Sequence, residues 1–200
     1  MKNERGRPRS FDIDVALNNV LQVFWKHGFQ NTSMNDLVEA TGLKKSSLYA
    51  AFGDKSSLYL KTLECYLVLL EKNHAQILIS EQDGRCAVEA FLRSLAEMLT
   101  SPHLPGGCFI VNGTADLGGS RMTEGVEVAL RSALKGSELL LKERLLRAQL
   151  DKQLPSNINP KELAELFFTL IAGLAMQAKG GASREKLDLV IGHAMRAWPE

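Results

Sequence analysis

One short stretch, residues 31–55, constrains the fold more than any other part of the chain. Ser33 and Asp36 have the spacing of a capping box, in which a hydroxyl and a carboxylate satisfy free N–H groups at a helix start. Apolar residues follow at helical spacing as far as Gly42, which can adopt the left-handed conformation that ends a helix. A second short helix is predicted over residues 44–52. The stretch therefore predicts two short helices joined by a tight turn.

The second of these helices has an apolar and a polar side. Leu43, Leu48 and Phe52 are predicted to point inward. The side chains left to face outward are cationic or carry hydroxyl groups, and such groups contact phosphates and base edges in DNA. These candidate DNA contacts are Lys44, Lys45, Ser46, Ser47 and Tyr49. An ordinary corner between two helices would have the same spacing, so the pair by itself leaves both interpretations open.

Further motifs surround the helix pair in a defined order. FWKHGF precedes the pair, TS, DLVEATG and SSLYAAF lie within it, and DK opens the next helix. Over residues 11–58 the chain resembles the TetR family of bacterial transcription regulators, whereas the rest resembles that family only in being helical. The resemblance implies an all-α protein with an N-terminal three-helix helix-turn-helix head and a C-terminal helical bundle for effector binding and dimerisation.

The resemblance also implies roles for residues next to the helix pair. Lys55, in the first turn of the following helix, matches the family's phosphate-contacting lysine. Thr32, Ser33 and Tyr49 correspond to further phosphate contacts. Many members of the family have serine or threonine where this chain has Lys44, so the start of the second helix can shift by a residue, and Lys44 can instead add a cation at the DNA face.

The first ten residues are strongly basic. They carry four cationic side chains and one carboxylate, and no hydrophobic side chain follows the first methionine. Such a segment cannot bury enough apolar surface to fold alone, so we expect a flexible arm over residues 1–10. Arg5, Arg7 and Arg9, with glycine and proline between them, resemble the core of an AT-hook, which lays arginines into an A·T-rich minor groove. A solvated basic tail is the alternative.

Composition and motifs exclude several other classes of protein. A 45% hydrophobic and 24% charged composition over 200 residues is that of a folded globular chain. No apolar run has the length of a membrane span and the basic N-terminus lacks the apolar core of a signal peptide, so we expect a cytoplasmic protein without membrane contact. The three cysteines and four histidines lack metal-site spacings, so no metal is expected. Nucleotide-binding and hydrolase motifs are also missing, which predicts no cofactor, no catalytic residue and no enzyme.

The remaining chain predicts a helical body. Helices are expected over residues 12–28, 54–80, 87–99, 108–117, 124–150, 161–179 and 183–198, which with the two short ones makes about nine. The piece at 108–117 begins CFIV, which suits a strand by propensity, but a lone strand among helices would lack a partner. We accordingly expect a helix-turn-helix domain over residues 11–55 and an effector-binding and dimerisation domain over residues 56–200.

The last two predicted helices carry more apolar surface than one core needs. This excess predicts a two-fold interface and therefore a homodimer, with a deep monomer core as the alternative. A homodimer would place two heads on a palindromic double-stranded DNA operator, with half-sites about one helical turn apart.

The body also offers side chains for a small-molecule pocket. Methionine and aromatic side chains suit varied apolar or amphipathic ligands, although they fill cores equally well. The candidate lining residues are Phe91, Met98, Phe109, Met122, Phe167 and Met176.

Cys108 is a candidate redox sensor. It follows a proline and two glycines at a predicted helix start, where free N–H groups and the helix dipole would lower the pKa of a thiol. Some TetR-like regulators sense oxidants or electrophiles through such a cysteine, and a small buried hydrophobic residue is the alternative. Together, these features predict a repressor that a small-molecule or thiol-reactive effector releases from its operator. A helical protein-interaction module without DNA binding remains the second hypothesis.

Overall fold

Capping side chains set the start of most helices. The computed structural model describes residues 11–199. Within that range, six helices begin directly after a side chain that accepts a hydrogen bond from a backbone N–H of the first turn, which supplies a partner that the helix itself cannot provide. These capping residues are Asp12, Ser33, Asp54, Asp83, Asn159 and Ser183.

The predicted pair of short helices is confirmed. α2 (Met34–Thr41) starts with the reciprocal Ser33–Asp36 capping box, and Gly42 ends it in the left-handed conformation with φ 65°. α3 (Lys45–Phe52) follows and starts one residue after Lys44, whose side chain makes no capping hydrogen bond. Leu37, Leu48 and Phe52 are buried beneath the two helices.

The first helix has a kink at its predicted end. α1 (Ile13–Asn31) is regular as far as Gly28, where the backbone leaves the helical conformation at φ 78° and ψ 173°, and one further turn follows. Only glycine adopts such a conformation readily, so Gly28 ends the regular part of the helix as predicted.

The helix predicted over residues 54–80 has a change of helical type that its sequence did not reveal. It consists of α4 (Lys55–Leu70), a π-helical turn η1 (Glu71–Ala75) and α5 (Gln76–Ser80) without a break. In η1 the Gln76 N–H donates to the carbonyl oxygen of Glu71, five residues back. Single π-turns of this kind occur frequently at functional sites.

The body contains the remaining helices. These are α6 (Gly84–Leu99), α7 (Phe109–Gly113) with the 3-10 turn η2 (Thr114–Asp116), α8 (Glu124–Leu150), α9 (Pro160–Lys179) and α10 (Arg184–Met195). The predicted helix at 87–99 begins three residues earlier, and no strand occurs between residues 11 and 199. With α4, η1 and α5 taken as one, the described chain has nine helices and the 3-10 turn, in agreement with the predicted all-α fold.

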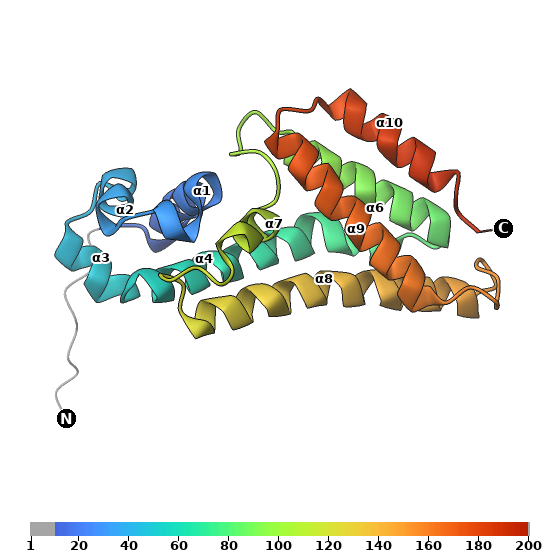
Figure 1. The fold of residues 1–200 in the computed structure, drawn as a ribbon, viewed down its shortest axis with the longest axis horizontal. Coiled ribbons are helices and arrows are strands. Elements are labelled where there is room, and N and C mark those ends of the chain that lie inside the picture. Colours follow the sequence, from blue (N-terminus) through green and yellow to red (C-terminus); the bar gives the residue numbers. More distant parts are fainter. Residues whose placement is uncertain (1–10, 200) are drawn as a thin grey trace.

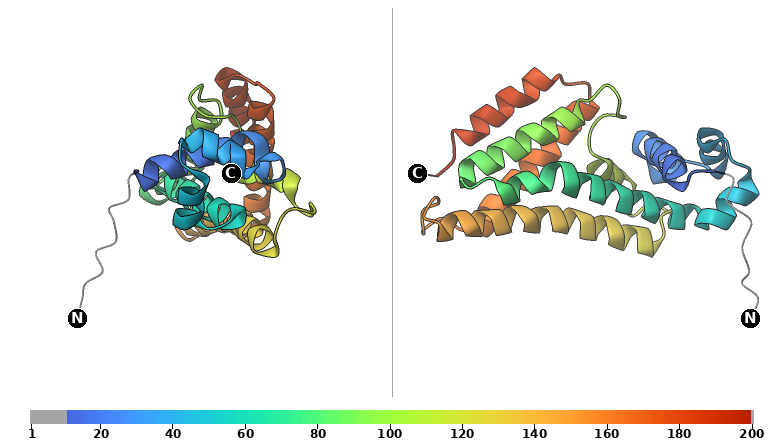
Figure 2. Two further views of the ribbon diagram at one scale, coloured as in Figure 1. Left: turned by 90° about the vertical axis from the view of Figure 1, so that its left-hand side faces the viewer. Right: turned by 180° about the vertical axis from the view of Figure 1, so that it is seen from behind.

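The molecule is elongated, with the head of α1–α3 at one end and α10 near the other (Figure 1). α4 leaves the head and runs beside α8 along the length of the body, as the right-hand view in Figure 2 shows. The domain boundary predicted between residues 55 and 56 falls in the first turn of α4. Aromatic rings from both sides of that boundary share one core, in which Phe24 of α1 meets Tyr59 of α4 edge-on at 5.0 Å.

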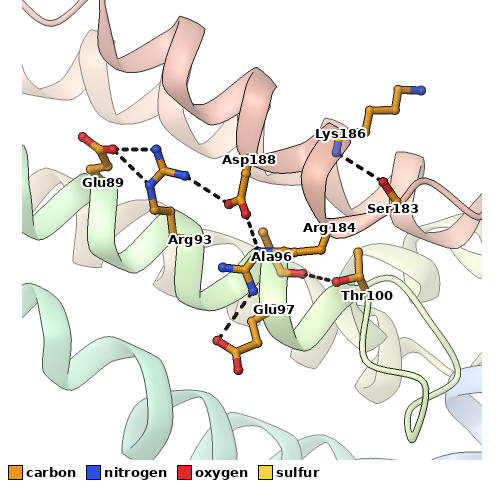
Figure 3. A network of polar contacts seen from close by, with 9 residues as sticks. All are labelled: Glu89, Arg93, Ala96, Glu97, Thr100, Ser183, Arg184, Lys186 and Asp188. Atoms are coloured by element: carbon orange, nitrogen blue, oxygen red, sulfur yellow. Dashed lines mark hydrogen bonds and ion pairs between the residues drawn. The ribbon is translucent and has the colours of Figure 1, made fainter.

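Ion pairs fasten α10 to α6 (Figure 3). Asp188 of α10 accepts from Arg93 of α6 at 3.2 Å and from Arg184 of its own helix at 2.8 Å. Arg93 also pairs with Glu89 at 2.7 Å, and Arg184 with Glu97 at 3.5 Å. The network therefore holds the last helix against the body at one face.

Between residues 11 and 199, no helix combines the length and hydropathy that a membrane crossing needs.

Candidate nucleic-acid interface

The outward face of α3 is polar, as predicted. Leu48 and Phe52 are buried with exposed fractions of 0% and 4%, which fixes the rotation of the helix on α1 and α2. The opposite face presents Lys44, Lys45, Ser46 and Tyr49 as exposed side chains, and Ser47 as a half-buried one. Two ammonium groups, two hydroxyls and a phenol thus share one solvent-facing surface.

The start of α3 adds electrostatic character to this surface. Lys44 is the N-cap, and no side chain caps the first turn of α3. The free N–H groups of that turn and the positive end of the helix dipole therefore lie beside Lys44 and Lys45. An anion such as a DNA phosphate is the natural partner for this combination.

Thr32 and Ser33, which were predicted together as phosphate contacts, have different surroundings. The Ser33 side chain is exposed and its hydroxyl accepts from the Asp36 N–H in the capping box. Thr32 has an exposed fraction of only 2%, and its hydroxyl donates to the carbonyl oxygen of Gly28 at 2.6 Å. The Thr32 hydroxyl consequently bonds to the kink in α1 instead of facing solvent, so a phosphate contact by Thr32 would use its backbone N–H.

Lys55 lies where α4 leaves the head. Its ammonium nitrogen is 4.3 Å from the centroid of the Phe29 ring, a cation–π contact that holds the side chain against the last turn of α1. Burial lowers the pKa of Lys55, the positive charge of Arg121 lowers it further, and the carboxylates of Asp116 and Asp36 oppose the change. The half-buried Lys55 therefore contacts the junction of head and body as well as the outer face.

A buried carboxylate joins the body to the head at the same junction. Asp116, at the end of η2, is 8% exposed and accepts a 2.6 Å hydrogen bond from the backbone N–H of Phe29. A guanidinium nitrogen of Arg121 also donates to the Gln30 carbonyl oxygen at 3.5 Å. Sequence reasoning missed both residues, because a sequence separation of 87 between Phe29 and Asp116 leaves no local signal of their contact.

Three of the predicted DNA contacts belong to the N-terminal arm. Arg5, Arg7 and Arg9 lie outside the residues that the structure describes.

The body encloses a cavity of about 80 Å³ between five helical segments. Phe91 and Met98, two of the six predicted pocket residues, line it. The other four do not: Phe109 belongs to the aromatic core, Met176 is 62% exposed, and Met122 and Phe167 pack elsewhere. The wall is formed by Leu70, His74, Ala75, Phe91, Leu95, Met98, Leu99, Cys108, Ile110, Val111, Leu134, Ser137, Leu140, Phe168 and Ile171.

Cys108 lines this cavity, but its thiol is not activated. It is the N-cap of α7, and its sulfur accepts a hydrogen bond from the Tyr66 hydroxyl at 3.3 Å. Burial raises the pKa of the Cys108 thiol, and this effect outweighs the hydrogen bonds from Tyr66 and from the helix start, which lower it. The predicted lowering of the Cys108 pKa is therefore wrong, because the site is apolar and enclosed.

The acidic, histidine and cysteine side chains of residues 11–199 do not gather into a metal site. No group of three or more such residues within the described part of the chain has a geometry that would hold an ion.

Comparisons with known proteins agree with this arrangement. The family profile described as "Bacterial regulatory proteins, tetR family" matches residues 17–62, and "Tetracyclin repressor-like, C-terminal domain" matches residues 84–194. The chain is 35% identical over 201 residues to the HTH-type transcriptional repressor ComR of Escherichia coli K12, covering 100% of this chain and 95% of that protein.

Solved structures extend the likeness to three dimensions. A cysteine mutant of the TetR family transcriptional regulator CifR, complexed with 26-base-pair double-stranded operator DNA, is 37% identical with a TM-score of 0.91, covering 96% of this chain and all of that one. The sequence motifs, the helix-turn-helix head, the helical body and both family matches lead to one conclusion. The chain belongs to the TetR family of transcriptional regulators, which bind DNA and are not enzymes.

Proposed function

We propose that the protein is a cytoplasmic repressor that binds a palindromic operator as a homodimer and releases it when an effector occupies the body cavity. The observation that carries the proposal is the outer face of α3, where Lys44, Lys45, Ser46 and Tyr49 are exposed above a buried Leu48. A structural corner needs no such face, whereas DNA recognition does. ComR, a relative over the whole chain, is named a repressor, and CifR was solved with operator DNA.

The proposal divides the candidate contacts by role. The side chains on α3 reach base edges and phosphates, while residues at the helix starts fix the register on phosphates. Arginines of the segment before residue 11 extend into the minor groove. The base and phosphate contacts are Lys44, Lys45, Ser46 and Ser47; the register contacts are Ser33, Tyr49, Lys55 and the backbone of Thr32; the minor-groove contacts are Arg5, Arg7 and Arg9.

Exposed apolar side chains on the last two helices support the homodimer. Leu166 and Met176 of α9 have exposed fractions of 59% and 62%, and Leu189 of α10 has one of 67%. Burying these side chains against a second copy would remove large apolar surfaces from water. The domain division follows from this arrangement, with residues 11–55 reading DNA and residues 56–200 binding effector and partner.

Two kinds of effector fit the cavity. The first is a small molecule bound without covalent change, which the nearly continuous apolar wall favours. The second is a thiol-reactive compound that modifies Cys108, which the position of this thiol in the wall favours and its raised pKa opposes. Either kind of effector would act at the body cavity.

Selection from a random pool of double-stranded DNA tests the operator proposal and identifies the bound sequence at the same time. We expect the purified protein to enrich an inverted repeat and bind it as a dimer. Lys55→Ala should weaken binding to all sequences by about tenfold and reduce the salt slope by roughly one. Lys135→Ala, an exposed lysine on α8, is the matched control and should leave affinity unchanged. A monomeric protein that enriches no sequence would support the interaction-module hypothesis instead.

Light scattering after gel filtration tests the dimer. Leu166→Glu with Leu189→Glu should convert the dimer to a folded monomer and abolish operator binding, because each head alone makes half of the contacts. Val128→Glu on α8, where the native side chain is 57% exposed, is the control and should stay dimeric. A Leu166/Leu189 variant that remains a dimer would place the interface elsewhere.

A further inference from the structure

His74 is the one imidazole in the wall of the body cavity. Its side chain is buried with an exposed fraction of 8%, and its Nδ1 lies 2.5 Å from the hydroxyl oxygen of Ser94 on α6. The second ring nitrogen, Nε2, forms no hydrogen bond with any residue between 11 and 199. Nε2 is not one of the fully buried side-chain atoms that lack a partner, so this nitrogen keeps accessible surface and is available for a hydrogen bond to a ligand.

The π-turn adds Ala75 to the part of the wall that Leu70 and His74 form. A π-turn stacks residues five positions apart, so Leu70 and Ala75 face the same side of the helix, with His74 beside them. A regular α-helix would rotate Ala75 away from Leu70. The change of helical type thus gives three neighbouring positions access to one cavity.

The other polar groups of the wall are already paired. The Cys108 sulfur accepts from the Tyr66 hydroxyl, and the Ser137 hydroxyl donates to the Ala133 carbonyl oxygen of its own helix at 3.2 Å. All remaining wall residues are apolar, and none carries a formal charge at neutral pH. Burial also lowers the pKa of His74, which keeps the imidazole neutral and leaves it one free hydrogen-bonding nitrogen.

We infer that the cavity binds a small uncharged molecule with a hydrocarbon body and a single oxygen atom, such as a ketone or an alcohol, and that His74 recognises this oxygen. The enclosed volume of about 80 Å³ is roughly half of that known to bind benzene in an engineered cavity, so the ligand has only a few non-hydrogen atoms. A carboxylate or an ammonium ion is excluded, because the wall offers no charge to pair with it. Ser94 acts as a positioning residue that holds the ring.

This inference rests on the proposed effector cavity and names the chemical class of its ligand. The test compares 2-butanone with 2-methyl-1-butene, which have the same shape but differ in the oxygen atom. Titrations of the full-length protein, followed by NMR signals of the Ile110, Val111 and Leu134 methyl groups, give the affinity for each compound. Changing one hydrogen-bonding partner should alter the ratio of the two affinities by about tenfold.

We expect His74→Leu to weaken 2-butanone binding and to leave 2-methyl-1-butene binding equal or stronger. His74→Gln, which retains hydrogen-bonding groups, should recover part of the preference, and Ser94→Ala should reduce it by freeing the ring. Ser137→Ala is the matched control because its hydroxyl is paired within α8, and it should leave the ratio unchanged. These additional variants keep the test decisive if His74→Leu fails to fold.

The outcomes separate this inference from the proposed function. An affinity ratio that is the same in the native protein and in all folded His74 variants would overturn the role of His74 and leave the cavity intact as a binding site. Cavity methyl signals that respond to neither compound would overturn the inference together with the effector cavity. Operator binding by the native protein is measured in the same experiments. It tests the DNA-binding proposal independently of His74 and of the effector cavity.

Discussion

The carboxylate of Asp116 accepts a 2.6 Å hydrogen bond from the backbone N–H of Phe29 and thereby ties the body to the head. The kink at Gly28 frees this N–H from the regular helical pattern of α1, and Asp116 supplies the missing acceptor. The short segment from Cys108 to Asp116 lines the cavity at its start, and its last residue accepts this hydrogen bond. The same short segment therefore contacts both the cavity and the helix that precedes α2 and α3.

Gly28→Ala should destabilise the protein. The backbone at φ 78° suits glycine, and a Cβ atom would lie 2.6 Å from Oδ2 of Asp116. Together these effects should lower the free energy of unfolding by about 1–3 kcal/mol, measured by chemical denaturation. Gly42→Ala is the control, because its φ is 65° but no atom lies within 4 Å, and it should cost about 1 kcal/mol. Equal losses for the two variants would show that contact with Asp116 adds nothing.

Asp116→Ala should loosen the head without unfolding it. The buried Phe29 N–H would lose its partner, at a cost of about 1–3 kcal/mol. Asp116→Asn keeps an acceptor oxygen and should retain most of the stability. Hydrogen exchange of the Phe29 amide is the direct measurement, and we expect fast exchange in the alanine variant only. Unchanged protection in Asp116→Ala would mean that the amide has another acceptor.

Alkylation of Cys108 should depend steeply on pH. The thiolate is the reactive form, and because burial raises the pKa of Cys108 above its usual value of 9.0, the reaction with iodoacetamide should be slow at pH 7 and should accelerate as pH rises beyond 9. The experiment uses a Cys65→Ser, Cys86→Ser background, since both of these cysteines are exposed.

The same modification tests the thiol-reactive effector. The added group would enlarge a side chain in the cavity wall, so alkylated protein should bind its selected DNA more weakly. Cys108→Ser in the same background should bind DNA normally, and treatment with the reagent should not change its DNA affinity. If the reagent still released DNA from that variant, Cys108 would not be the sensing residue.

Asp188→Asn should weaken the attachment of α10. It would reduce two ion pairs, to Arg93 and Arg184, whose side chains are about one-third exposed. Solvent screens such pairs, so we expect a loss of about 1 kcal/mol in the free energy of unfolding that shrinks as salt is raised. Glu165→Gln removes the more exposed pair with Lys161 and should have no measurable effect. A salt-independent loss would point to a packing defect instead of lost ion pairs.

The sequence alone was enough to determine the helix-turn-helix head and the order of the helices. The Ser33–Asp36 capping box and the Gly42 turn involve residues within four positions of one another, so their geometry follows from local composition. The same is true of the polar face of α3, because helical periodicity sets which side chains lie opposite Leu48.

Only the tertiary structure decided which residues form the cavity and the junction. Phe168 lines the cavity and its neighbour Phe167 does not, since adjacent helical residues point about 100° apart and packing against other helices selects between them. His74 has no distinguishing sequence pattern, and Cys108 was expected to be reactive; enclosure by the surrounding helices makes His74 a candidate ligand contact and Cys108 an unreactive thiol. These properties depend on contacts between distant segments, and periodicity within one helix carries no information about its neighbours.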